Sequence, residues 1–497
     1  MAGEMEQTDV LIAGLGPVGA TLGVYLTRAG FRVTVCERDR DVYPLPRAAH
    51  LDHEVMRLLH MAGGADAVLA SSAPLSAYEF RNAAGDLLMG FRPDPLVKAT
   101  GFPQGSMFHQ PTLELALRET LAAEPLADIR LGAQVTGFVD AGSRVIVQVK
   151  SDDGSACEIT ARFLIGCDGG GSQVRRTADL PLEDMGFDEP WLVIDSTLKN
   201  NVKYLSTIGL QHCDPARPVT SMPMGPGRHR WEFMMLPGET ADDVTSDAKL
   251  AELVRPFADP DAITIERRAV YRFHAVTARQ WRKGRVVLAG DAAHQMPPFM
   301  GQGLCSGVRD AANLGWKLVS VLKGEADTAL LDTYQIERDP HVRAITGLAI
   351  FMGRVVCTQN KEEAAQRDRD MTSKPEGERM GGGMPPLDGL KTGIFGTHAA
   401  VGQIAPEPWL KDGRRLDDVI GLTPFLVTRD PSGLTSIAAR GKVFALADLA
   451  DQHGAFAAVM GDAPALLVRP DRLIFGAGGA AELVAAWNAY ASGRAAA

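Results

Sequence analysis

Three short glycine-rich segments stand far apart in the chain and carry residue types from which a nucleotide site can be built. They are Gly14 to Gly19 (GLGPVG), Cys167 to Gly169 (CDG) and Gly290 to His294 (GDAAH). Glycines in the first let backbone N–H groups approach a pyrophosphate, and the carboxylates in the other two can accept hydrogen bonds from hydroxyl groups. Each segment alone is a weak signal, but together they indicate one site assembled from distant parts of the chain.

The first segment lies where a dinucleotide-binding turn requires it. Thr8 to Ala13 is a short apolar run that predicts a buried strand, and Ala20 to Ala29 is rich in helix-forming residues. Phe31 to Cys36 predicts the second strand, and Glu37 follows it, roughly twenty residues after the turn, where a carboxylate binds a ribose 2′-hydroxyl. Glu37 would repel a 2′-phosphate, so we expect the ADP half of FAD here, held by Gly14, Gly16, Gly19 and Glu37.

Composition limits the function classes. The 497 residues carry a net charge of −10 and no basic run, which argues against nucleic acid as a partner. The N-terminal segment is polar and acidic, and no stretch is long enough for a transmembrane helix, so we expect a cytoplasmic protein without a membrane anchor. The six cysteines are scattered without metal-ligand spacing, which indicates reduced thiols and no metal site.

Strand and helix patterns alternate along the chain and predict a mixed α/β (α+β) fold. A Rossmann-like FAD-binding domain is expected from residues 1–76, 106–180 and 285–360, and an inserted β-rich substrate-binding layer from residues 77–105 and 181–284. Residues 361–386 are charged and then rich in glycine and proline, which predicts a linker. Residues 387–497 alternate short apolar strands and helices, as in a small appended α/β domain.

Three extended motifs carry a family resemblance. They are Gly14-x-Gly16-x-x-Gly19, Cys167-Asp168-Gly169 followed by Ser172, Val174 and Arg175, and Gly290-Asp291-Ala292-Ala293-His294 followed by Pro297, Pro298, Gly301 and Gly303. Over nearly the whole chain, the sequence resembles the single-component (class A) FAD-dependent aromatic hydroxylases, and within them the 3-(3-hydroxyphenyl)propionate hydroxylase branch. The resemblance implies a thioredoxin-like C-terminal domain. No cysteine follows Cys357, so we expect that domain to be structural or to support a homodimer rather than to perform disulfide chemistry.

The resemblance implies roles for residues of the third motif around FAD. Asp291 would bind the ribityl hydroxyls, with a turn or N-cap aspartate as the alternative. The turn through Gly301 and Gly303 opens a helix whose first N–H groups, at Leu304 and Cys305, would stabilise negative charge on the reduced flavin.

Further cofactor contacts are implied outside that motif. Arg47 and Gln110 occupy positions that contact the FAD phosphates and ribityl chain in similar enzymes; the alternatives are a surface charge and a helix cap. Asp168 and Arg175 match the motif associated with FAD and nicotinamide binding, and Asp168 is the stronger candidate because Arg175 can be solvated.

The implied reaction uses FAD in two steps. NADH or NADPH, with NADH favoured by the resemblance, reduces the flavin, and O₂ then forms a flavin C4a-hydroperoxide that hydroxylates an electron-rich phenol. The implied product arises by ortho-hydroxylation of a 3-hydroxyphenylpropionate-like compound. The backbone carbonyl of Pro297 or Pro298 is implied as the acceptor for the phenol. His294 is a candidate general base, although structural hydrogen bonding is the commoner role for such a histidine.

The substrate pocket is expected between the flavin and the β-rich layer. Met222, Met224 and Phe233 on candidate strands, with Phe299 beside the flavin turn, predict an apolar wall that favours an aromatic ligand; plain core is the commoner role of such residues. A propionate-bearing substrate requires a cation, and the sequence offers four without choosing among them: Arg228, Arg230, His212 and His229.

The motifs leave alternatives open. A hydroxylase of a larger polyketide or antibiotic aromatic shares every flavin motif. A flavin oxidase or dehydrogenase shares the first loop but does not need Asp168 and Gly290-Asp291 in this order. A flavin halogenase is expected to contain a WxWxIP segment, which the chain lacks. A non-enzymatic FAD-binding module would show no substrate-stimulated NAD(P)H consumption.

Overall fold

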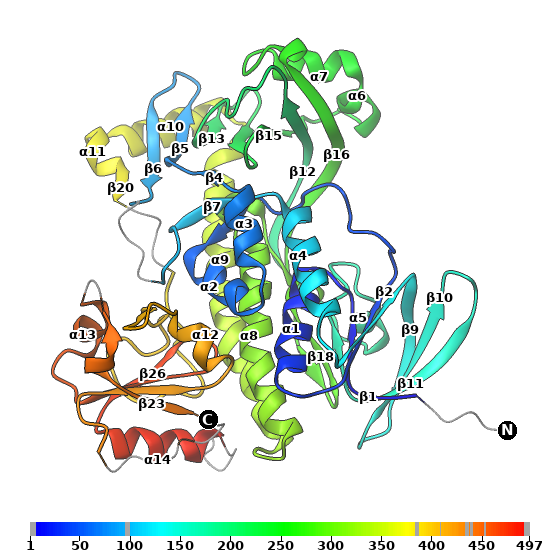
Figure 1. Ribbon diagram of the computed structural model, residues 1–497. Coiled ribbons are helices and arrows are strands. Elements are labelled where there is room, and N and C mark those ends of the chain that lie inside the picture. Colours follow the sequence, from blue (N-terminus) through cyan, green and yellow to red (C-terminus); the bar gives the residue numbers. More distant parts are fainter. Residues whose placement is uncertain are drawn as a thin grey trace.

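A computed structural model describes residues 6–94, 100–382, 387–407, 409–432, 437, 441–451 and 454–491 of the chain (Figure 1). Two large sheets and a smaller C-terminal sheet are arranged around two long helices, α8 (Gly303–Leu322) and α9 (Asp332–Val356). The predicted mixed α/β architecture is confirmed.

The first sheet has eight strands and contains the N-terminal strand. Its main path runs β17-β18-β11-β1-β2-β8, with bounds Arg282–Lys283, Val286–Leu288, Ala156–Gly166, Glu6–Ala13, Val33–Glu37 and Ala127–Leu131. An antiparallel extension, β10 (Val145–Ser151) and β9 (Ala133–Asp140), pairs with β11. Helix α1 (Pro17–Arg28) packs against α8 and against α4 (Gln110–Ala122), which buries the apolar residues of the central parallel strands.

The carboxyl ends of three parallel strands lie together at one edge of this sheet. The strand register places Ala13 of β1 beside Gly166 of β11, and Gly166 beside Leu288 of β18. Because the strands point the same way, the three glycine-rich segments that follow them leave the sheet side by side. This edge is where open α/β sheets bind their ligands.

The second sheet has nine strands and lies against the C-terminal part of α9 (Figure 1). Its order is β19-β16-β12-β15-β14-β13-β5-β6-β20, with bounds His294–Gln295, Ile263–Ala278, Leu182–Leu198, Arg228–Met234, Val219–Pro223, Ile208–Cys213, Ala77–Asn82, Leu87–Arg92 and Met380–Gly382. One face packs on α6 (Ala241–Thr245) and α7 (Asp247–Val254). The opposite face includes Trp191 and Phe80, which pack with α9 residues.

Small elements join the two large sheets. A three-stranded sheet of β3 (His50–Asp52), β7 (Gly105–Met107) and β4 (Ala73–Pro74) lies between them with α2 (His53–Met61) and α3 (Ala65–Ser71). Helix α5 (Gln173–Thr177) follows β11.

The segment predicted as a linker is structured over most of its length. Residues 361–382 form α10 (Lys361–Thr372), α11 (Glu376–Arg379) and β20, which pairs in parallel with β6. Arg367 anchors α10 by donating to the carbonyl oxygens of Val355 and Cys213, each at 2.8 Å. The charged composition reflects a solvated helix face rather than an extended chain. Residues 383–386 lie outside the described residues.

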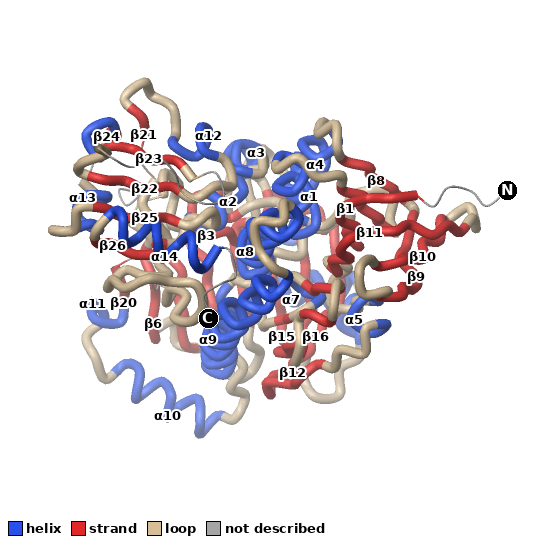
Figure 2. Tube along the Cα trace, turned by 90° about the horizontal axis from the view of Figure 1, so that it is seen from below, coloured by secondary structure: helices blue, strands red, loops and turns tan. Residues whose placement is uncertain are grey.

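The C-terminal domain packs on α8 from the side opposite the first sheet (Figure 2). Its sheet has the order β23-β22-β25-β26, with β22 parallel to β23 and antiparallel to β25. The bounds are Lys442–Ala445, Phe425–Thr428, Ala465–Val468 and Ile474–Gly478; further elements are α12 (Leu416–Ile420), α13 (Ala455–Met460), α14 (Ala480–Ala491), β21 (Trp409–Leu410) and β24 (Leu449–Ala450). That this domain is thioredoxin-like stays a prediction from the resemblance.

Within the described residues, no single helix has the length and apolarity to cross a membrane; the segment Thr328–Val356, which includes α9, and α10 pass together by length and composition only, as a pair bent by 113°.

Candidate active site

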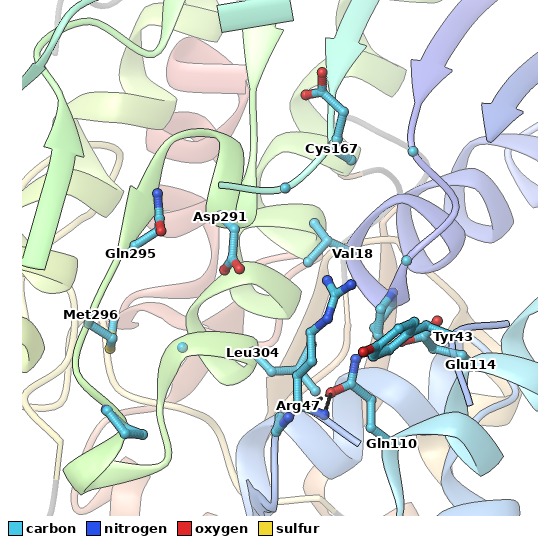
Figure 3. Close-up of a pocket in the computed structure, with 18 of the residues that line it drawn as sticks. Val18, Tyr43, Arg47, Gln110, Glu114, Cys167, Asp291, Gln295, Met296 and Leu304 are labelled. Atoms are coloured by element: carbon cyan, nitrogen blue, oxygen red, sulfur yellow. Dashed lines mark hydrogen bonds between the residues drawn. The ribbon is translucent and has the colours of Figure 1, made fainter. Parts of the chain in front are cut away.

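A cavity of about 490 Å³ opens where the strand ends of the first sheet face the second sheet (Figure 3). This volume falls in the range of roughly 300–1,000 Å³ that is usual for small-molecule sites. The cavity brings together most of the residues predicted from the sequence: Gly14, Gly16, Glu37, Arg47, Gln110, Asp168, Met222, Arg230, Asp291, Pro298, Phe299, Gly301, Gly303 and Leu304 all line it.

The first glycine loop is held close to the second motif. Gly14 has a φ of +100°, and a Cβ there would overlap the carbonyl oxygen of Cys167. A Cβ at Gly19 would overlap the carbonyl oxygen of Gly14, whereas one at Gly16 would meet no protein atom within 4 Å. Gly16 also caps α1 without any side-chain hydrogen bond, so the first N–H groups of this helix remain available to an anion.

Glu37 fixes the loop from the end of β2. Its Oε2 atom accepts a hydrogen bond from the Leu15 N–H at 2.7 Å, and its Oε1 atom accepts one from the Asp39 N–H at 3.0 Å. The carboxylate therefore has a defined position at the cavity, with lone pairs left for a further donor.

Asp291 and Arg47 present opposite charges to the cavity. Figure 3 shows their side chains reaching into the same space from opposite sides. Asp291 follows Gly290, whose φ of +61° turns the chain, and its carboxylate is open to the cavity. Desolvation raises the pKa of Asp291, and the charges of His294 and Arg47 partly oppose that shift. Throughout the described part of the chain, no carboxylate pairs with the Arg47 guanidinium.

Gln110 positions the Arg47 segment. Its Oε1 atom accepts hydrogen bonds from the N–H groups of Arg47 at 3.1 Å and Ala48 at 2.6 Å, and its Nε2 atom donates to Glu114 at 2.6 Å. The amide is therefore largely occupied, so its contribution to a cofactor site is mainly to hold Arg47.

The amino end of α8 is a second uncapped helix terminus at the cavity. Gly301, with a φ of +62°, makes the turn before it, and a Cβ there would lie 2.8 Å from the Cβ of His50. The side chain of the N-cap residue Gln302 is engaged elsewhere, by Asp52 and Arg309, each at 3.0 Å. The N–H groups of Gly303, Leu304 and Cys305 thus lack intrahelical partners and favour negative charge in front of them.

Asp168 and Arg175 tie the second motif to the third. The Asp168 carboxylate accepts hydrogen bonds from Ser172 and from the N–H groups of Gln173 and Val174, at 2.7 and 3.0 Å, which caps the amino end of α5. Arg175 is buried rather than solvated and donates to the carbonyl oxygen of Ala292 at 3.0 Å. Both side chains organise the loops around the cavity.

His294 does not line the cavity, which corrects its candidacy as general base. Its Nε2 atom lies 2.6 Å from Oδ2 of buried Asp310, which also accepts from the Gly290 N–H at 3.1 Å, and its ring packs on Trp281. The histidine is turned inward and stabilises the loop that presents Asp291. Pro298 lines the cavity whereas Pro297 does not, and the Cys305 thiol is buried against the carbonyl oxygens of His50 and Gly301.

Two predicted wall residues do not line the cavity. Met222 lines it, but Met224, one residue beyond the end of β14, does not, although both belong to one apolar cluster with Leu75 and Met107. Phe233 lies on the opposite face of the second sheet, among the residues that contact α7. Successive side chains of a strand point to opposite faces, so Arg230 and Glu232 face the cavity and Phe233 cannot.

Sequence reasoning missed several wall residues. Tyr78, Phe91, Glu232 and Phe273 line the cavity on the side of the second sheet, and His50 lines it beside Gly301. Glu232 could have been predicted, because it lies two residues after the predicted wall residue Arg230 on the same strand, and side chains two residues apart share a face. Tyr78 and Phe91 carry no such signal, since only the pairing of β5 with β13 and β6 brings them to this wall.

Comparisons with known proteins agree on the cofactor. Residues 7–349 match the family described as FAD binding domain. A probable NADH-specific resorcinol 4-hydroxylase of Rhodococcus jostii is 37% identical, over 97% of this chain and 95% of that protein. A 3-(3-hydroxy-phenyl)propionate/3-hydroxycinnamic acid hydroxylase of Mycolicibacterium smegmatis is also 37% identical, over 73% of this chain and 63% of that protein.

Solved structures share the fold over almost the entire length. The OxyS anhydrotetracycline hydroxylase of Streptomyces rimosus superposes with a TM-score of 0.79 and 26% identity, covering 97% of this chain and 99% of that one. The flavin-dependent monooxygenase PieE, in complex with FAD and substrate, has a TM-score of 0.80 at 22% identity and covers 98% of this chain and 99% of that one.

Proposed function

The chain belongs to the FAD-binding family of flavin-dependent aromatic monooxygenases, and on this premise we propose that its substrate is a small phenol, hydroxylated ortho to its hydroxyl group with NADH and O₂. One observation carries the proposal: a single cavity joins the nucleotide loop of the first sheet to a wall of the second that contains the aromatic side chains of Tyr78, Phe91 and Phe273. Free cysteines support a cytoplasmic enzyme.

The residues at the cavity fit FAD. The uncapped amino end of α1 and the space in front of Gly16 suit a pyrophosphate, with Arg47 as its cation. The Glu37 carboxylate suits the ribose hydroxyls of the ADP half, and the Asp291 carboxylate suits the ribityl hydroxyls. Gly14 and Gly19 allow the close turn, and Gln110 and Asp168 hold the loops that carry these groups.

The other end of the cofactor would meet α8. Gly301 and Gly303 leave room for a flat ring, and the free N–H groups through Leu304 and Cys305 would stabilise negative charge on it. When bound, FAD supplies the redox chemistry, taking a hydride from NADH and activating O₂ for transfer of one oxygen atom. The Pro298 carbonyl, Met222 and Phe299 would position the phenol and exclude water.

The curated relatives favour a single-ring substrate over a fused system. They are a probable resorcinol 4-hydroxylase and a 3-(3-hydroxy-phenyl)propionate/3-hydroxycinnamic acid hydroxylase, so resorcinol and 3-(3-hydroxyphenyl)propionate are the first substrates to test. A polyketide aromatic is the second candidate, supported by the likeness to OxyS at 26% identity.

The test is NADH oxidation by the FAD-loaded protein with and without a panel of phenols, with quantification of hydroxylated product. We expect strong stimulation by a single-ring phenol, with product equal to the NADH consumed. Stimulation by fused-ring phenols alone would move the assignment to the polyketide branch. Bound flavin without stimulation by any phenol would refute the hydroxylase proposal.

A further inference from the structure

The wall of the cavity on the second sheet contains one buried carboxylate, that of Glu232. This residue lies in the middle of β15, between Val193 on β12 and Thr220 on β14. Only 5% of its surface is exposed, and it lines the cavity together with Arg230, two positions earlier on the same face of the strand. The rest of this wall combines aromatic and apolar side chains with two basic ones, Arg272 and His274, which pair with Asp188.

The Glu232 carboxylate has no hydrogen-bond donor among the described residues. Arg230 is its one ion-pair partner there, with Nη1 at 3.7 Å from Oε1. That guanidinium is committed elsewhere, since it donates to both oxygens of Asp195 at 2.7 and 3.0 Å and to the carbonyl oxygens of Pro46 and Arg47 at 2.5 and 2.8 Å. A largely buried acceptor without a protein donor is unfavourable unless water in the cavity or a ligand supplies one.

Electrostatics make this carboxylate a stronger base than an exposed one. Burial raises the pKa of Glu232, while the charge of Arg230 opposes the shift and that of Asp195 adds to it. Arg267 also lowers the pKa, but its guanidinium contacts Asp195, Pro46 and Tyr271 rather than Glu232. The carboxylate is therefore suited to accepting a proton from a ligand hydroxyl.

Tyr78 adds a hydroxyl to the same wall. Its oxygen accepts a hydrogen bond from Gln211, and Gln211 is itself fixed by Thr220 at 2.7 Å. No acceptor for the Tyr78 hydroxyl proton lies within the part of the chain that the structure describes, so this O–H can donate into the cavity. Glu232 and Tyr78 thus offer an acceptor and a donor on an aromatic wall.

The cations offered by the sequence for a substrate carboxylate are engaged. Arg228 pairs with Glu266 outside the cavity, and Arg230 is committed as described. His229 lies 2.9 Å from the Ser221 hydroxyl, and burial lowers its pKa to about 4, so its imidazole is neutral near pH 7. His212 packs edge-on against Phe257 and does not line the cavity. A carboxylate placed near Glu232 would meet like charge instead.

We propose that Glu232 binds the hydroxyl group of an uncharged phenol, accepts its proton, and selects such phenols, diphenols included, over phenols that carry a carboxylate. The inference rests on the proposed function. In the proton-transfer step, the substrate O–H bond breaks, the proton binds a carboxylate oxygen of Glu232, and the electron pair remains on the phenolate oxygen. The ring gains electron density at its ortho and para carbons, where the new oxygen is added, and the step needs no oxidant of its own.

The test compares Glu232→Gln with a matched control, Glu79→Gln. Glu79 is also a glutamate of the second sheet with 5% of its surface exposed, but it pairs with Arg81 at 2.7 Å and does not line the cavity. Each FAD-loaded variant is titrated with resorcinol and with 3-(3-hydroxyphenyl)propionate, following the flavin absorbance, and product formation is then measured. FAD content and thermal unfolding verify that each variant is folded.

We expect the wild type to bind resorcinol at least about 10-fold more tightly than the propionate. Glu232→Gln should lower kcat with resorcinol by about 100-fold, the lower end of general-base effects, and reduce the binding preference toward unity. Glu79→Gln should change neither. If Glu232→Gln does not fold, Glu232→Asp, which keeps the charge but shortens the reach, should give an intermediate kcat.

Two results would overturn the inference while leaving the proposed function intact. One is a Glu232→Gln variant whose kcat with resorcinol stays within twofold of the wild type. The other is a wild-type enzyme that binds the propionate more tightly than resorcinol. Failure of the wild type to hydroxylate any phenol would instead refute the proposed function itself.

Discussion

Charged side chains are partnered differently in two regions of this molecule. Between the first sheet and the C-terminal domain lies an interdomain ion cluster, in which each charged group has a partner of opposite charge: Arg57, Lys317, Glu337, Asp417, Arg469, Asp471 and Arg472. At the cavity, the carboxylates of Asp291 and Glu232 and the guanidinium of Arg47 receive or donate no hydrogen bond within the described ranges. The paired charges connect the domains, whereas the unpaired charges at the cavity are available to bind a ligand.

The largest effect on stability is expected at the centre of the interdomain ion cluster. Asp417 accepts from Arg57 at 2.6 and 3.0 Å and from Arg472 at 2.8 Å, all with fully buried side chains. Asp417→Ala leaves two buried cations unpaired and should lower the free energy of unfolding by about 3–5 kcal/mol, measured by urea denaturation. Asp418→Ala removes a half-exposed neighbour and should cost less than about 1 kcal/mol. Equal losses of unfolding free energy in the two variants would contradict the role of Asp417 as the partner of two buried arginines.

Acid should weaken the same cluster through Glu337. Burial raises its pKa, but the charges of Arg469 and Lys317 dominate and lower it from 4.5 to about 2. Because the folded pKa is depressed, its stabilisation is present above about pH 4.5 and is lost as the pH falls toward 2; it amounts to about 3 kcal/mol. The difference in unfolding free energy between wild type and Glu337→Gln should therefore shrink below pH 4.5. A difference in unfolding free energy that stays constant with pH would contradict the pairing of Glu337 with Arg469 and Lys317.

Substitutions at two glycines of the first loop should differ in their effects: one should lower both protein stability and FAD binding, and the other FAD binding alone. Gly14→Ala forces a side chain into a φ of +100° and against the Cys167 carbonyl, which should cost at least about 1–2 kcal/mol and abolish FAD retention. Gly16→Ala meets no protein atom and should leave the unfolding free energy within about 0.5 kcal/mol. It should still weaken FAD binding at least about 10-fold, measured by flavin fluorescence. A stable Gly14→Ala variant that retains FAD would refute this account of the loop.

The smallest effect on stability is expected at Asp291, where a substitution should change FAD affinity alone. Asp291→Asn removes a charge that burial disfavours, so the FAD-free protein should unfold at the same temperature as the wild type or higher. FAD affinity should fall by about 10–100-fold, because hydrogen bonds to a charged acceptor contribute roughly 1.5–3 kcal/mol. Calorimetry of both forms tests this, and a lower melting temperature without a change in FAD affinity would show a structural aspartate instead.

The cofactor side of the cavity could be predicted from the sequence because its signals are local. Gly14, Glu37 and Asp291 each lie at or just after the carboxyl end of a buried apolar strand, and parallel strands bring these ends to one edge whatever the loops between them contain. The mixed α/β fold follows from the same strands.

The substrate side could not be predicted equally well because it depends on long-range pairing. Phe233 and Glu232 exchange faces with a one-residue change of register, and Tyr78 reaches the wall only through the pairing of β5 with β13. The inward turn of His294 depends on Asp310, sixteen residues later, and the helix in the predicted linker depends on contacts of Arg367 with distant carbonyls.

Oxygen labelling tests the central claim most directly. FAD-loaded protein is supplied with NADH, a single-ring phenol such as resorcinol and ¹⁸O₂, and the product is analysed by mass spectrometry. The account predicts one ¹⁸O atom in each hydroxylated product, formed in proportion to the NADH consumed. NADH consumption that yields only peroxide, or a product whose oxygen comes from water, would contradict it.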